Sequence, residues 1–212
     1  MDIPTADSYQ HKMSSPPQKR FLNKAHPPHI ATLILMAGAS ALAMNIFLPS
    51  LPSMAAHFET PYHTMQLSVA VYLAFSAVLQ LFIGPLSDKW GRRPVLLWGL
   101  GLFCLATLGC ILATNVYIFL AFRMAQAMVA VAMVLSRAVV RDIYPQDQAA
   151  SMIGYVAMGM AVVPMIGPAI GGVLDEHIGW QANFWLLLAV GVLTFALVYF
   201  DLGETARKSD NS

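Results

Sequence analysis

A charged side chain lies inside an apolar stretch of this sequence. Arg123 follows seven residues that carry no charge, and Gln126 comes one helical turn later. A guanidinium stays charged and is costly to place in a membrane, so it needs a cavity, an anion or a set of acceptors. Two interpretations remain open. Arg123 is either a structural arginine bonded to nearby carbonyl groups, or part of a polar cavity, together with Asn45, that handles anionic or protonatable groups.

A polar stripe marks the apolar run 65–85. Its polar residues recur every fourth position, so a helix would place them on one face. In lipid that face should turn toward protein or water, and interhelical hydrogen bonding and a transport pathway both explain it. The stripe consists of Ser68, Tyr72, Ser76 and Gln80. With Asn45, Arg123 and Gln126, the last three of these form the candidate substrate and coupling cavity.

A tight charged turn, 84–96, separates two long apolar runs. It holds one acid and three bases, and the pair Arg141-Asp142 follows a later apolar run. Opposite charges at a partly dry interface can form a clasp with two states, whereas solvated pairs contribute only about 0–1 kcal/mol. The plainer alternative is that the bases only fix orientation, and the two roles are compatible. The candidate network comprises Gly84, Asp88, Gly91, Arg92, Arg93, Arg141 and Asp142.

The run 151–174 is rich in helix breakers. In a membrane bundle these residues permit close contact and bending, because neighbouring helices satisfy the freed carbonyl groups. Close packing alone and a bend used in conformational exchange both remain open. The breakers considered are Gly154, Pro164, Gly167, Pro168, Gly171 and Gly172.

The elements that carry these residues follow from composition. The chain is 58% hydrophobic and only 11% charged, which indicates a polytopic membrane protein. Because lipid cannot satisfy an open strand, we expect an all-α protein. Six runs reach spanning length, at roughly 30–49, 65–85, 95–113, 116–140, 151–174 and 183–200. They form one bundle over 30–203, flanked by a disordered tail at 1–29 and a short tail at 204–212.

The distribution of Lys and Arg predicts the orientation. Bases occur in alternate connections, whereas 50–64, 114–115 and 175–182 have none. The positive-inside rule then places both termini and the charged turn in the cytoplasm. The similar segments 82–85 and 165–168 lie three helices apart in opposite orientations, which suggests an inverted three-plus-three repeat.

Enzyme chemistry is not expected. No span contains a histidine, and paired metal ligands, a G-x-S-x-G turn and an ATP-binding loop are all missing from the sequence. We therefore predict no catalytic residue, no metal site, no cofactor and no nucleic-acid partner. Cys104 and Cys110 are read as buried thiols.

Three stretches together resemble the major facilitator superfamily, and within it the drug:proton antiporters of the Bcr/CflA multidrug efflux type. The charged turn is similar to the family's G-x-L-x-D-[RK]-x-G-[RK]-[RK]-x-x-L motif. Arg123-Met-Ala-Gln126 with Arg137 and Arg141-Asp142 resembles the fourth-helix motif. The run from Gly154 to Gly172 resembles the antiporter motif, departing from it at Val163. The likeness covers residues 30 to about 205, an N-terminal half.

This resemblance implies half of a twelve-helix fold in the bacterial inner membrane. The charge network would latch the cytoplasmic side, and Arg123 would belong to the coupling and substrate region. The full form would export small amphipathic compounds by alternating access with proton coupling, although no predicted span contains an acid. A second six-helix half or a homodimer would cover the cavity. The alternative is a non-transporting six-helix protein that acts through a partner half.

Overall fold

The computed structural model describes residues 28–205, which form a bundle of helices without strands in that range. Six segments are long and apolar enough to span a membrane, which confirms the predicted all-α, multi-pass architecture. The first span consists of α2 (Ile30–Asn45), η1 (Leu48–Ser50) and α3 (Leu51–His57), and the fourth of α6 (Val116–Gln126), η2 (Ala127–Val129) and α7 (Ala130–Ile143). The others are α4 (Tyr62–Trp90), α5 (Arg92–Ile111), α8 (Gln146–His177) and α9 (Gln181–Asp201). Most of the predicted tails lies outside the described residues.

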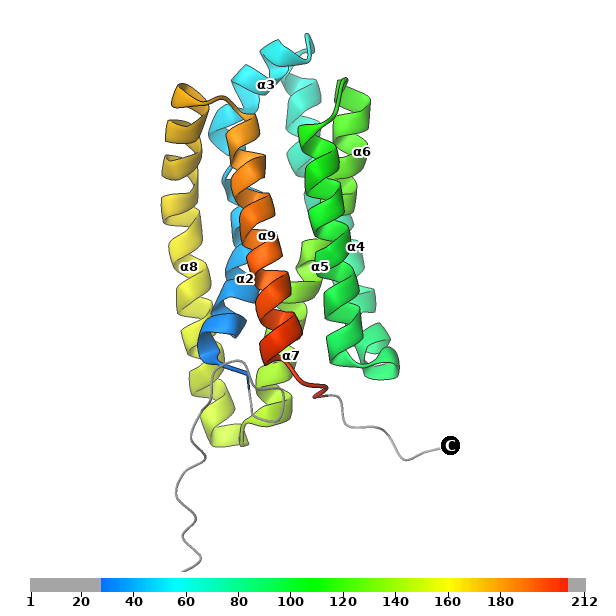
Figure 1. The fold of residues 1–212 in the computed structure, drawn as a ribbon, viewed down its shortest axis with the longest axis vertical. Helices are drawn as coiled ribbons and strands as arrows, with labels where there is room; N and C mark the ends of the chain where they lie inside the picture. Colours follow the sequence, from blue (N-terminus) through cyan, green and yellow to red (C-terminus); the bar gives the residue numbers. More distant parts are fainter. Residues whose placement is uncertain (1–27, 206–212) are drawn as a thin grey trace, which may run out of the picture.

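The helices run along the long axis of the bundle, and both ends of the described chain lie at the same end of it (Figure 1). We call this the basic end, because Lys89, Arg92 and Arg93 belong to it. α2 lies at the centre, in contact with α7, α8 and α9. α5 packs against α6 and α9, whereas α4 contacts α6 and α7.

The charged turn is much tighter than the sequence suggests. α4 continues through Pro85 to Trp90 and α5 begins at Arg92, so Gly91 alone is non-helical between them. Gly91 has φ +96°, a conformation that a residue with a side chain rarely adopts. Its missing side chain also matters, because a Cβ here would meet the carboxylate of Glu204. The chain therefore reverses at one residue, and most of the turn's charges lie on helix ends.

The helix breakers of the fifth span make close contact with the first span. α8 stays helical through both of its prolines. A Cβ on Gly159 would meet Ile34, and one on Gly171 would overlap the carbonyl oxygen of Ile46. Gly167 lies against Leu42 at ordinary contact distance. Small residues thus let α8 approach α2 along several turns, as the packing interpretation requires.

Two spans leave most of their apolar surface uncovered. In α4 and in α8, 17% of the most apolar window is buried, against 33–56% in the other four spans. Large exposed side chains follow both helices, among them Phe82 and Leu81 on α4 and Met158 and Met165 on α8. In the membrane this surface faces either lipid or another protein.

Candidate functional site

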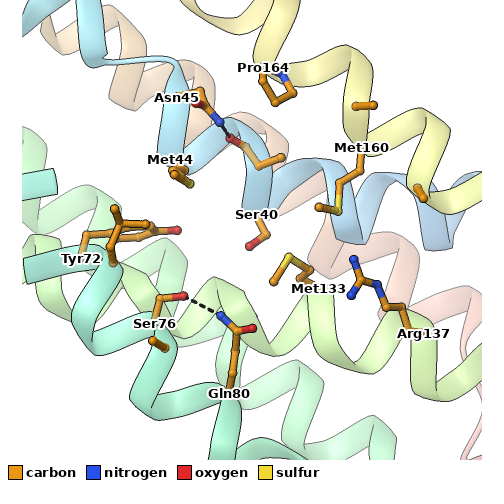
Figure 2. Close-up of a pocket in the computed structure, with 15 residues that line it drawn as sticks. Ser40, Met44, Asn45, Tyr72, Ser76, Gln80, Met133, Arg137, Met160 and Pro164 are labelled. Carbon is orange, nitrogen blue, oxygen red and sulfur yellow. Dashed lines mark hydrogen bonds between the residues drawn. The ribbon is translucent and has the colours of Figure 1, made fainter. Parts of the chain in front are cut away.

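A pocket of about 680 Å³ opens between α2, α4, α7 and α8. The polar stripe of α4 lines one side of it, and α2 and α8 form the opposite side (Figure 2). Its wall mixes polar groups with flexible apolar side chains, namely Ser40, Ala41, Met44, Asn45, Tyr72, Leu73, Ser76, Ala77, Gln80, Met133, Arg137, Ala157, Met160, Ala161 and Pro164. Sites for small organic molecules have this size and this kind of wall.

Four of the six predicted cavity residues come together here. Asn45, Tyr72, Ser76 and Gln80 all line the pocket. Asn45 Nδ2 donates to the Ala41 carbonyl at 2.7 Å, and Gln80 Nε2 donates to Ser76 Oγ at 3.3 Å (Figure 2). The amide oxygens of both residues accept no hydrogen bond from the described residues and can still accept one from a ligand. Three positions of the stripe thus line the pocket, whereas Ser68 lies buried away from it.

Arg123 and Gln126 do not line the pocket. Arg123 is only 1% exposed and lies behind Tyr72, with its guanidinium carbon 4.3 Å from the centre of that ring. On its other side it lies 4.0 Å from the centre of the Phe47 ring. The structure therefore places the guanidinium in the protein interior, sandwiched between two aromatic faces, where cation–π attraction is strongest.

Hydrogen bonds tie this arginine to three spans. Nη2 donates to the Ala43 carbonyl at 2.8 Å, in the last turn of α2, where carbonyl groups lack an intrahelical donor. Nη1 donates to Gln126 Oε1 at 2.6 Å, and Gln126 Nε2 donates to Thr107 Oγ1 at 2.8 Å. This is the acceptor network that the structural interpretation of Arg123 predicts. Held by these bonds, the guanidinium packs against the ring of Tyr72, which lines the pocket.

The charge network at the basic end centres on Arg92. Its side chain bonds to Asp88 Oδ1 at 2.6 Å, to Asp142 Oδ2 at 3.1 Å and to the Ser87 hydroxyl. The Arg92 side chain is 13% exposed and that of Asp142 23%, whereas Asp88 is 64% exposed. The bond between α5 and α7 is therefore the partly dry one, and Asp88 contributes from the solvent side.

The other two predicted bases point elsewhere. Arg93 Nη2 donates to the Tyr199 carbonyl at 3.2 Å, and its guanidinium lies 5.4 Å from the centre of that ring. Adjacent helix residues point about 100° apart, so Arg93 reaches α9 while Arg92 reaches α7. Arg141 is exposed and forms no hydrogen bond or ion pair with the described residues.

The sequence interpretation missed three acidic or basic groups. Asp201 is only 2% exposed and accepts from Thr32 Oγ1 at 2.7 Å and from the His29 backbone at 2.9 Å. Since α9 ends at this residue, the last span does contain an acid. Glu204 accepts from the Arg92 backbone at 2.8 Å. Arg137, which the sequence analysis placed only in the fourth-helix motif, lines the pocket.

A sequence profile described as Major Facilitator Superfamily matches residues 33–212. The chain belongs to the Major Facilitator Superfamily. Among its curated Major Facilitator relatives, "Chloramphenicol resistance protein" of Pseudomonas aeruginosa is 38% identical over 74% of this chain and 39% of its own length. "Multidrug resistance protein D" of Escherichia coli (strain K12) is 35% identical over 78% of this chain and 42% of its own length. These names place the chain among Bcr/CflA-type relatives, and it spans less than half the length of each.

The Major Facilitator fold is also found by structure. The crystal structure of the human organic anion transporter MFSD10 (TETRAN) matches 90% of this chain with a TM-score of 0.69. The sequences are 20% identical, and the match covers 49% of that transporter. The likeness therefore establishes the fold, and it agrees with a six-helix half of a transporter architecture.

Proposed function

We propose that this chain supplies one half of a secondary transporter that exports small amphipathic compounds by alternating access. The pocket between α2, α4, α7 and α8 carries the proposal, because it combines polar groups with Met44, Met133 and Met160. Methionine side chains adapt to ligands of different shape. The names of the relatives, which refer to chloramphenicol and multidrug resistance, support drug-like substrates.

A second six-helix unit completes the site in this proposal. The pocket is open on one side, and the uncovered apolar faces of α4 and α8 flank it. Covering these faces would remove them from lipid and enclose a ligand between two halves. Either a second half in the same or another chain, or a second copy of this chain, satisfies this requirement.

The bond between Arg92 and Asp142 serves as the gate at the basic end. It joins α5 to α7 across a partly buried contact, whereas the pair with Asp88 is exposed and easily broken. A clasp of this kind can favour one of two arrangements of the helices. The basic end faces the cytoplasm in this proposal, because the bases gather there.

Proton coupling is assigned to the complete transporter. Within the described helices, the buried carboxylate at the basic end is Asp201, which is already held by Thr32 and the α2 backbone. None of the described residues that line the pocket is acidic. The proposed proton carrier is therefore not among the described residues that this chain contributes to the pocket.

A binding experiment tests the proposed site. The 212-residue chain is reconstituted in lipid nanodiscs, and binding of radiolabelled chloramphenicol is measured. Ala157→Phe, which fills the pocket, should abolish saturable binding, whereas Val192→Phe on the exposed face of α9 should leave it intact. Absence of saturable binding by the parent chain, or equal loss in both variants, would refute the assignment of the pocket. Dye efflux from cells that express this chain alone then shows whether a partner half is needed.

A further inference from the structure

We propose that the pocket selects amphipathic anions over amphipathic cations, and that the positive charge of Arg137 determines this preference. This inference rests on the proposed function, because it names the substrate class of the same pocket. It differs from the cavity interpretation in the sequence analysis, in which Arg123 would handle the anionic group.

The first support is the position of Arg137. It lies on α7 one turn after Met133, and both side chains line the pocket. Its neighbours Ser136, Ala138 and Val139 are buried in the bundle, whereas Arg137 is exposed. Figure 2 shows its guanidinium at the side of the pocket that holds Met133 and Met160.

The second support is the contrast between the two arginines of the fourth span. Two nitrogen atoms of Arg123 donate to the Ala43 carbonyl and to the Gln126 side-chain oxygen. Aromatic rings pack against both faces of its guanidinium. Arg137 has no hydrogen bond or ion pair with any of the described residues. Its donors are therefore available to a ligand in the pocket, whereas two Arg123 nitrogen atoms are bonded and the third, Nε, is buried without a partner.

The third support is the positive net charge of the pocket wall. Among the described residues of its wall, Arg137 is charged and all others are neutral. The largely apolar wall strengthens the field of a single charge relative to open water. An anionic group of the ligand would meet this field and a planar set of five N–H donors, whereas a cation would be repelled.

The neutral polar groups then set the orientation of such a ligand. Asn45, Tyr72, Ser76 and Gln80 lie on the α2 and α4 sides of the pocket, away from Arg137 in Figure 2. The site therefore fits a compound with an acidic group at one end, an apolar middle that contacts the methionines, and a hydrogen-bonding group at the other end.

The test compares two fluorescent probes that share a dansyl group. One carries a carboxylate, as in dansylglycine, and the other carries a trimethylammonium group on a tail of similar length. The chain is reconstituted in nanodiscs of zwitterionic phosphatidylcholine, and binding to empty nanodiscs is subtracted. The parent chain should bind the anionic probe more tightly, and Arg137→Gln should weaken that binding about tenfold to a hundredfold.

Three further variants make the test specific. Arg137→Lys should retain much of the preference, and Arg137→Glu should reverse it in favour of the cationic probe. Arg141→Gln removes the same charge one turn further along α7, outside the pocket, and should leave binding unchanged. If Arg137→Glu does not fold, the Gln and Lys variants decide the question.

The outcomes separate this inference from the proposed function. Equal binding of both probes by the parent chain, with no effect of Arg137→Gln, would overturn charge selection while leaving the pocket as a binding site. An equal loss in Arg137→Gln and Arg141→Gln would also overturn it, because it would show a general surface field. Failure of the parent chain to bind either probe saturably would overturn both.

Discussion

Replacing Arg123 by Met should destabilise the bundle strongly without removing a pocket wall. Methionine keeps the unbranched shape between Phe47 and Tyr72 but leaves Gln126 Oε1 and the Ala43 carbonyl without their donor. Each buried acceptor that loses its partner costs about 1–3 kcal/mol, so the pair costs about 2–6 kcal/mol. Removing the buried charge offsets part of this loss. The offset is small, because two aromatic rings already stabilise the charge.

Thermal unfolding in detergent measures this effect. A change of 1 kcal/mol shifts Tm by about 2–4 °C in a domain of this size, so Arg123→Met should lower Tm on the order of 10 °C. The double variant Arg123→Met/Gln126→Leu should lose less than the single variant, because it removes one of the orphaned acceptors. Arg141→Gln, which changes the same charge at an exposed site, is the control.

The opposite pattern would refute the structural role. If Arg123→Met kept the parent Tm but lost ligand binding, the guanidinium would act on the ligand directly. In that case the sequence interpretation of Arg123 as a cavity residue would be preferred to the structural one.

Three other predictions concern helix packing, the ion pairs of Arg92 and the orientation in the membrane. Gly171→Ala should lower Tm, since its Cβ would overlap a backbone oxygen of α2, whereas Gly154→Ala, with open space around it, should be neutral or stabilise by about 0.5–1 kcal/mol. Equal shifts would contradict the close packing of α8 on α2. Asp142→Asn should lower Tm more than Asp88→Asn, because the Arg92 to Asp142 bond is the less exposed one. The reverse order would contradict the assigned gate. In a cysteine-free background, Lys89→Cys should resist an impermeant maleimide in intact cells, whereas Tyr117→Cys, at an exposed position in the first turn of α6, should react. The opposite labelling would invert the proposed orientation.

The helices were predictable from the sequence because membrane spans depend on length and composition. The stripe of α4 was predictable for the same local reason, since residues four apart share a face. The ends of the helices were less predictable from the sequence. The first span continues through Pro49 and Pro52 as η1 and α3, because proline is tolerated in the first turn of a helix.

The partners of the charged residues could not be read from the sequence. Arg123 turns inward because the Ala43 carbonyl, 80 positions earlier, and the Phe47 ring are brought to it by folding. Arg92 and Arg93 are neighbours, yet they reach different helices. Arg137 lies within the predicted span 116–140, but its place in the pocket depends on α2, α4 and α8, which only folding brings near it.

Photoaffinity mapping tests the central claim, that the pocket between α2, α4, α7 and α8 binds the transported compound. A photoreactive amphipathic drug analogue is crosslinked to the chain in nanodiscs, and the labelled peptides are identified by mass spectrometry. The account predicts labelling of the pocket residues Tyr72, Met133 and Met160 that an excess of unreactive drug prevents. Labelling confined to exposed residues such as Trp98 and Leu105 of α5, or labelling that excess drug does not reduce, would contradict it.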